Sequence, residues 1–246
     1  DEGSKATTRA RKISTIRIFF KYLSQKEKIL EVNPAQNLET PKLEKRMPKY
    51  LSLEDSKKLL DVASDEENRN HKRDYAITTL FLNCGMRLSE LVGINIDDID
   101  FEECKMTVIG KGNKERTIYL NKSCMMAIND YLSSRPPKNT IKHDSKHSEK
   151  ALFLSEQKRR ISNRTVQFII QKELGKAGLD TSKLSVHKLR HTAATLMYQY
   201  GGVDIRALQE LLGHQSISTT EIYTHVSNDQ VRQAVENNPL SDPKNL

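Results

Sequence analysis

The first 25 residues carry apolar side chains at helical spacing: Ile13, Ile16, Phe19, Phe20 and Leu23. This stripe predicts an amphipathic helix. The opposite face of that helix is basic, with Arg9, Arg11, Lys12, Arg17 and Lys21. Because one helix cannot bury such a stripe alone, we interpret residues 1–40 as the C-terminal part of a helical domain. Residues 41–51 follow as a basic linker that contains two prolines.

A second domain is predicted over residues 52–246. Ser52, followed three residues later by an acid, is typical of a helix start, and Gly85 ends a helix that begins near residue 75. Segments 106–109 and 116–120 flank the turn "GKGNK" and predict a β-hairpin. Residues 136–150 form a polar loop, and further helices are expected at 166–174, 187–200, 205–212 and from about 219. The pattern therefore predicts a mainly α protein with a small antiparallel β-sheet, an α+β fold.

Charge narrows the class of partner. The chain has 40 Lys and Arg residues against 32 acids, a net charge of +8 that favours a polyanion, with nucleic acid ahead of membrane. Cys84, Cys104 and Cys124 are too far apart for a zinc pair, and their odd number argues against a disulfide framework. No apolar stretch of about 18 residues and no signal peptide is visible. We therefore expect a soluble, cytoplasmic protein with no membrane partner.

Several short stretches concentrate residues that can act on a phosphate: Arg87 in "CGMRLSEL", Lys111 in "IGKGNKER", His187 and Arg190 in "HKLRHT", His214 in "LLGHQS" and Tyr223 in "TTEIYTH". His187 and Arg190 are three residues apart and share one helix face. Each stretch also has a non-catalytic interpretation, because a lone Arg is usually a surface charge and a lone Tyr usually packs against its neighbours. His187 and His191 have zinc-ligand spacing, but the Glu of a metalloprotease helix and a third ligand are missing.

Together these stretches resemble a known family. The segments "GMRLSELVGI", "VIGKGNKER", "LSVHKLRHTAATLM" and "LLGHQSISTTEIYTHV" match, in order and spacing, the tyrosine recombinases (the lambda-integrase or phage integrase family), and most closely their Xer branch. The resemblance extends from about Lys5 to the C-terminus. It implies a catalytic domain over residues 52–246, preceded by the end of a helical core-binding domain.

The resemblance also implies a reaction. Tyr223 would attack a DNA phosphodiester and form a 3′-phosphotyrosyl link with release of a 5′-hydroxyl, so that strands are rejoined without ATP. Arg87 and Arg190 would stabilise the negative charge on the non-bridging oxygens in place of a metal. No metal and no cofactor is therefore expected.

The remaining residues would move protons or orient others. His214 would donate a further hydrogen bond to the phosphate, and Lys111 would protonate the departing oxygen. His187 would act as the base for Tyr223. Glu90 would orient Arg87.

Partners follow from the same resemblance. Double-stranded recombination sites would be held by basic and polar side chains: Arg9, Lys12, Lys49, Arg159, Arg160, Asn163 and Arg164. The C-terminal tail is amphipathic through Val231, Ala234, Val235 and Leu240. By the resemblance it would dock on a neighbouring protomer, and the alternative is that it packs on its own domain or frays. We expect dimers or tetramers on DNA, with a related recombinase or an accessory protein as a further partner.

Three alternatives remain open. A mobile-element integrase or transposase would share every catalytic group with a recombinase that resolves chromosome dimers. A type IB topoisomerase uses similar chemistry as a monomer, and the docking tail argues against it. A DNA-binding protein that has lost catalysis is disfavoured by the complete residue set.

Overall fold

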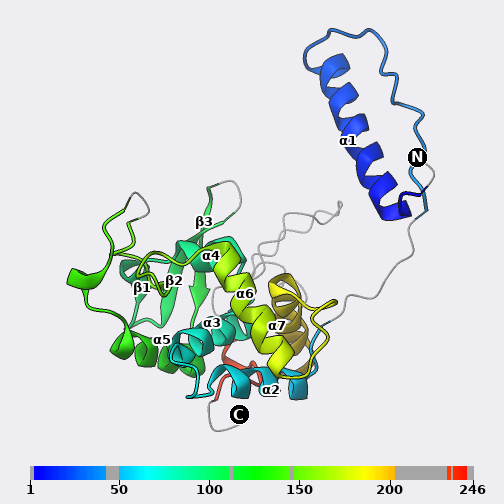
Figure 1. Ribbon diagram of the computed structural model, residues 1–246. Coiled ribbons are helices and arrows are strands. Elements are labelled where there is room, and N and C mark those ends of the chain that lie inside the picture. The colour runs from blue at the N-terminus through cyan, green and yellow to red at the C-terminus, as the bar shows by residue number, and fades with distance from the viewer. Residues whose placement is uncertain are drawn as a thin grey trace. The chain divides into compact units, whose positions relative to one another are not determined.

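The computed structural model describes residues 3–42, 50–110, 113–144, 147–202, 232–233 and 235–242. The chain divides into two units, Asp1–Pro48 and Lys49–Leu246, and the division falls within the predicted linker. The first unit contains helix α1 (Ala6–Gln25), drawn in blue in Figure 1. Within the described part of this helix only Ala10 is buried, and Phe19 is 55% exposed. The predicted helix is present, and its apolar stripe is largely uncovered by the described residues.

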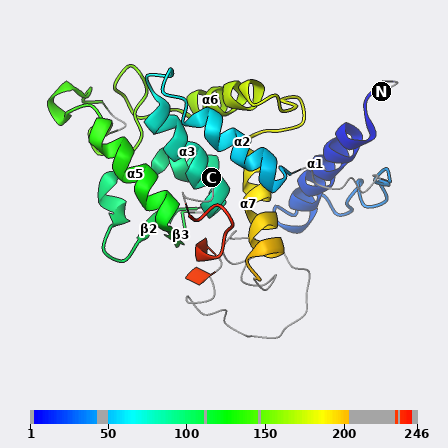
Figure 2. The same ribbon diagram turned by 90° about the horizontal axis from the view of Figure 1, so that it is seen from below.

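The second unit is built around helix α3 (His71–Cys84), in which eleven of fourteen residues are buried. Four helices pack near it: α2 (Leu53–Ala63), α5 (Lys122–Ser134), α6 (Asn163–Lys176) and α7 (Val186–Tyr200). Figures 1 and 2 show α3 between α5 on one side and α7 on the other. This helix is buried on nearly all sides because it forms the centre of the core, and its buried charged residues Arg73 and Asp74 are hydrogen-bonded to each other.

A small antiparallel sheet lies beside this bundle, with strands β1 (Ile99–Asp100), β2 (Lys105–Ile109) and β3 (Glu115–Tyr119) in that order. Met106 pairs with Ile118 and Val108 with Arg116, so these four residues share one face of the hairpin. The mainly α fold with a small antiparallel sheet is confirmed. The remaining short elements are α4 (Leu88–Gly93) and the 3₁₀ turns η1 (Ile96–Asp98) and η2 (Lys138–Thr140).

Two helices begin earlier than their apolar pattern indicates. The first turn of α6 is polar, and its start is set by Ser162, whose Oγ accepts from the Thr165 N–H at 3.1 Å. Helix α3 begins at His71, four residues before the predicted start. The helices expected at 205–212 and from about 219 lie outside the described residues. Within the described part of the chain, no helix is long and apolar enough to cross a membrane.

Candidate active site

Arg87 occupies the junction between two helices. Helix α3 ends at Gly85, which adopts the left-handed conformation (φ 57°), and α4 begins directly after Arg87. Glu90, in the first turn of α4, accepts from the Arg87 backbone N–H at 2.6 Å and from its Nη1 at 2.8 Å. One carboxylate therefore fixes both the start of α4 and the guanidinium of Arg87.

Arg190 reaches the same place from helix α7. Its Nη1 donates to the carbonyl oxygen of Gly85 at 2.7 Å and lies 4.0 Å from Glu90 Oε2. The side chain is almost fully buried. Burial, followed by the positive charges of Arg87 and Arg116, lowers the pKa of Arg190 to about 10. The guanidinium therefore stays charged at neutral pH, so two cations from distant parts of the sequence converge on Gly85 and Glu90.

The sequence reading missed Arg116, which also binds Glu90. Arg116 Nε donates to Oε1 at 3.1 Å and its Nη2 donates to Oε2 at 2.8 Å. Burial alone would raise the pKa of Glu90, but the hydrogen bond and charge of Arg116, followed by the contacts from Arg87, lower it to about 2. A signal was available, because strand alternation places Arg116 on the same face as buried Ile118.

His187 begins the exposed side of helix α7 and contacts His191 one turn later. Their Nε2 atoms lie 3.2 Å apart and the rings meet edge to face. Burial, followed by the charges of Arg190 and Lys188, lowers the pKa of His187. A neutral imidazole can accept a proton, and its partner nitrogen influences which tautomer is present. His191, to which the sequence analysis gave no catalytic role, therefore belongs to this cluster.

Three catalytic candidates, one directly before α4 and two on α7, line one groove of about 630 Å³. Arg87, Arg190 and His187 line it together with Asn163 and Gln167 from helix α6. Arg116 is not among its lining residues. With Gln171, also on α6, the groove is lined by two guanidiniums, an imidazole and three amides that can face an anionic ligand.

Other predicted catalytic residues cannot be placed. Lys111, His214 and Tyr223 lie outside the described residues, as does Lys49 among the predicted DNA contacts. Within the described ranges, no group of three or more His, Cys, Asp or Glu side chains is arranged to hold a metal ion. The His187–His191 pair accordingly has no third ligand there.

The structure separates the predicted DNA contacts into two groups. Arg9, Lys12, Arg159, Asn163 and Arg164 are exposed. Arg160 is different. Its Nη1 donates to the carbonyl oxygens at the end of α4, at 3.1 Å to Val92 and 3.0 Å to Gly93, and its Nη2 binds Asn95 Oδ1 at 2.6 Å. The expectation of a DNA contact at Arg160 is corrected, because its guanidinium closes the C-terminal end of α4.

The described part of the C-terminal tail packs on its own domain. Val235 and Leu240 are buried, the Asn121 side chain donates to the Val235 carbonyl at 3.1 Å, and Asn238 donates to the Leu82 carbonyl at 3.1 Å. In this structure the two apolar residues lie against α3 and α5 of their own domain, and docking on a neighbouring protomer stays a prediction. Val231 and Ala234 lie outside the described residues.

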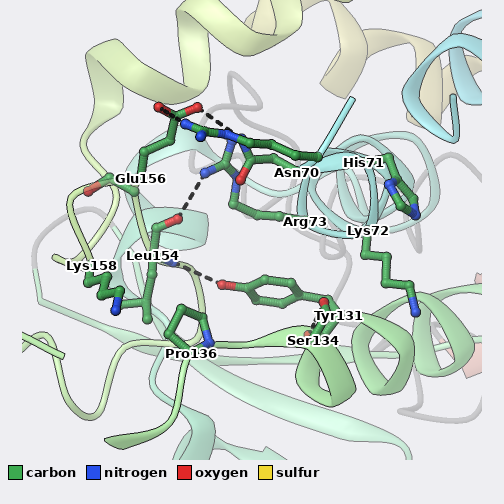
Figure 3. A pocket seen from close by; sticks show the side chains of 12 residues that line it. Asn70, His71, Lys72, Arg73, Tyr131, Ser134, Pro136, Leu154, Glu156 and Lys158 are labelled. Atoms are coloured by element: carbon green, nitrogen blue, oxygen red, sulfur yellow. Dashed lines mark hydrogen bonds and ion pairs between the residues drawn. The ribbon is translucent and has the colours of Figure 1, made fainter. Parts of the chain in front are cut away.

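A second hollow, of about 300 Å³, lies at the other end of helix α3 (Figure 3). Most of its charged groups are paired. Arg73 donates to Asp74 at 2.8 Å and to the Leu154 carbonyl at 3.1 Å, and Glu156 accepts from Arg69 and Asn70. Helix α3 is about 21 Å long at 1.5 Å per residue. These pairs fasten the start of α3 to the 151–160 segment, well away from the arginines beyond Gly85.

Known proteins resemble this chain along most of its length. The sequence model of the phage integrase family matches residues 49–230. The chain is 58% identical over 241 residues to a tyrosine recombinase XerC of Caldanaerobacter subterraneus subsp. tengcongensis, an alignment that covers 98% of this chain and 65% of that protein. A crystal structure of XerA recombinase is similar with a TM-score of 0.60 at 31% identity, covering 90% of this chain and 81% of that one.

The fold also recurs in a more distant protein. A structure of the Tn1549 transposon integrase in complex with circular intermediate DNA has a TM-score of 0.71 at 20% identity, covering 96% of this chain and 80% of that one. The chain belongs to the phage integrase family, the tyrosine recombinases, and falls within their Xer branch. It spans just under two thirds of the length of the XerC relative.

Proposed function

We propose that this chain is a site-specific DNA recombinase that cleaves and rejoins DNA through a 3′-phosphotyrosyl intermediate. The observation that carries the proposal is the convergence of Arg87 and Arg190 on one groove, with both guanidiniums held by fixed acceptors. Two fixed cations suit the extra negative charge that a phosphodiester gains as a nucleophile attacks it. The similarity to a tyrosine recombinase XerC supports a recombinase of the Xer branch, with a mobile-element integrase of the same chemistry as the alternative.

In this mechanism the Tyr223 oxygen forms a bond to phosphorus while the bond from phosphorus to the 5′-oxygen breaks. The proton of Tyr223 passes to His187, whose lowered pKa keeps it neutral and able to accept. Lys111 supplies a proton to the departing 5′-oxygen, and His214 donates to a non-bridging oxygen. Rejoining is the reverse sequence, so the energy of the broken bond is retained in the protein–DNA link.

A nicked substrate that loses its short 5′-hydroxyl strand after cleavage tests this proposal. The wild-type chain should accumulate a protein–DNA species that survives denaturation. Tyr223→Phe should abolish that species while leaving binding of the same DNA intact. A covalent species that still forms with the Phe variant would contradict the assignment of the nucleophile.

We further propose that the reaction requires no divalent metal, because Arg87 and Arg190 fill the charge-neutralising role. Formation of the covalent species should continue in excess chelator. Loss of the species in chelator and its return with one added metal would contradict this part of the proposal and return His187 and His191 to a ligand role.

We propose that the protein acts in the cytoplasm and assembles as a dimer on one recombination site and as a tetramer on two. The support is the family and the net positive charge, which suits duplex DNA. Because Val235 and Leu240 complete the protein's own core, release of the tail would be needed before it could dock elsewhere. Sedimentation of the Tyr223→Phe protein with one-site and two-site DNA should show the two assemblies. A single copy on each site under all conditions would instead favour a topoisomerase-like enzyme.

A further inference from the structure

Arg116 occupies a position that strand alternation normally gives to an apolar residue. It faces inward on β3, paired with Val108 and two residues before buried Ile118. A charged group on a core-facing position is stable only when it is paired and hydrogen-bonded. The partner is Glu90, whose side chain is completely inaccessible to solvent and whose two oxygens both accept from Arg116.

The same carboxylate is shared with the two groove arginines. Arg87 donates to Glu90 through Nη1 at 2.8 Å, and Arg190 Nη1 lies 4.0 Å away. A carboxylate placed between two cations offsets part of the charge that they could present to a phosphate. Arg116 supplies a third positive charge to this one negative group, so the four side chains together remain doubly positive.

The hairpin also approaches this cluster closely. A Cβ atom added at Gly110 would lie 3.6 Å from Glu90 Oε1 and 3.8 Å from Arg87 Nη1. The end of β2 thus limits the positions open to both side chains from one side, while Arg116 on β3 holds the carboxylate through a two-point contact. Arg116 itself does not line the groove, so it acts on the reaction through Glu90.

We propose that Arg116 is a positioning residue for DNA cleavage: it holds both oxygens of Glu90, offsets the charge of that carboxylate, and so keeps the guanidiniums of Arg87 and Arg190 correctly placed, with an excess of positive charge, for the scissile phosphate. The proposal rests on the function proposed above. It predicts that the bidentate geometry matters as well as the charge, because a lysine cannot contact both oxygens in the same way.

The first measurement is single-turnover cleavage of the nicked substrate by Arg116→Gln and Arg116→Lys. We expect Arg116→Gln to lower the cleavage rate roughly 10- to 100-fold, the range found for residues that orient a ligand group, with single-site binding unchanged. Arg116→Lys should recover only part of this loss. Wild-type cleavage rates in both variants would overturn the proposal.

Two modified substrates separate this role from a purely structural one. A methylphosphonate at the scissile position removes one negative charge, so cleavage depends less on the guanidiniums, and the deficit of Arg116→Gln relative to wild type should shrink. A bridging 5′-sulfur leaves without needing a proton, and on that substrate the deficit should persist. If the sulfur substrate restored the cleavage rate of Arg116→Gln and the methylphosphonate did not, the proposal would be wrong. Arg116 would then support proton donation by Lys111, the lysine of the hairpin.

Arg135→Gln provides a matched stability control. Arg135 is a half-buried arginine of the same domain that donates to the carbonyl oxygens of Leu152 and Ala151, at 3.2 and 2.7 Å. Its replacement should lower the melting temperature without changing the cleavage rate of the folded protein. If Arg135→Gln slowed cleavage as much as Arg116→Gln at equal loss of stability, the effect would be general destabilisation and the proposal would be wrong.

A double-mutant cycle with Glu90→Gln completes the test. Once the carboxylate is removed there is no negative charge for Arg116 to offset, so Arg116→Gln should cost little more in that background. Fully additive losses would contradict the proposal. If the wild-type protein formed no covalent species, the proposed function itself would be wrong. If the wild type and Arg116→Gln both cleaved normally, only the proposal for Arg116 would be wrong.

Discussion

Helix α3 has an arginine–carboxylate cluster with a buried carboxylate near each end, and the two clusters differ in charge balance. At its start, Arg73 is paired with Asp74, and Arg69 with Glu156. Beyond its other end, Glu90 is shared by guanidiniums from three parts of the chain. The balanced cluster satisfies itself, whereas the unbalanced one retains positive charge beside an open groove. The excess charge, and not burial of an ion pair as such, marks the site that can bind a phosphate.

The largest effect on stability should come from the balanced cluster. Arg73→Met leaves the buried Asp74 carboxylate without its cation, although Asn68 still donates to it at 2.9 Å. Removing one partner of a buried pair typically costs about 3–5 kcal/mol of unfolding free energy. Denaturant unfolding measures this cost, and cleavage by the folded fraction should stay at the wild-type rate. If folded Arg73→Met cleaved DNA more slowly than wild type, the cluster at the start of α3 would also contribute to the reaction, and the comparison would be wrong.

The next effect concerns the unbalanced cluster and should appear in the reaction. Arg190→Lys keeps one positive charge but loses the planar pair of donors, so it should slow single-turnover formation of the covalent species roughly 100- to 1,000-fold. Its melting temperature should change less than that of Arg73→Met, since a lysine can still donate to the Gly85 carbonyl. Full activity of Arg190→Lys would show that charge alone, without fixed geometry, is sufficient.

A third prediction concerns how the free energy of unfolding depends on pH. Glu173, near the balanced end, is buried; Thr78 donates to its Oε2 at 2.9 Å, and its Oε1 has no hydrogen-bond partner among the described residues. Burial, then the charge of Asp74, raises its pKa to about 8 from 4.5. The unfolded chain releases this proton at lower pH than the folded chain does. The free energy of unfolding should therefore fall as pH rises from about 4.5 to about 8.

Glu173→Gln tests this assignment directly. The amide avoids the cost of a buried charge and can still accept from Thr78. It should raise the unfolding free energy by roughly 1–3 kcal/mol at pH 8 and leave it nearly unchanged at pH 4. Denaturant melts of wild type and variant at both pH values provide the measurement. An equal shift at the two pH values would show that the gain comes from packing and not from ionisation.

The sequence predicted only part of the cluster around Glu90. Arg87, Glu90, His187 and Arg190 stand in motifs, and helical spacing and a glycine stop were enough to place them at element ends. Arg116 was overlooked because its partner is 26 residues away and only the sheet register brings the two together. Arg160 was misassigned for a related reason: a basic run looks like a DNA-binding surface until one guanidinium is used for distant carbonyls. Local patterns predicted the elements, whereas contacts between distant segments needed the structure.

The smallest predicted effect distinguishes two arginines four residues apart on the predicted DNA-binding surface. Arg164 is exposed in the first turn of α6, so Arg164→Gln should weaken DNA binding a few-fold at every sequence and lower the slope of log affinity against log salt by about 1. Stability should be unchanged.

Arg160→Gln is the matched control. It leaves the carbonyls at the end of α4 without their donor, so it should reduce stability by roughly 1–3 kcal/mol and leave the salt slope as it was. Binding titrations over a range of salt, with melting curves for both variants, measure the two effects. If Arg160→Gln changed the salt slope and Arg164→Gln did not, the division between DNA-facing and fold-supporting arginines would be reversed.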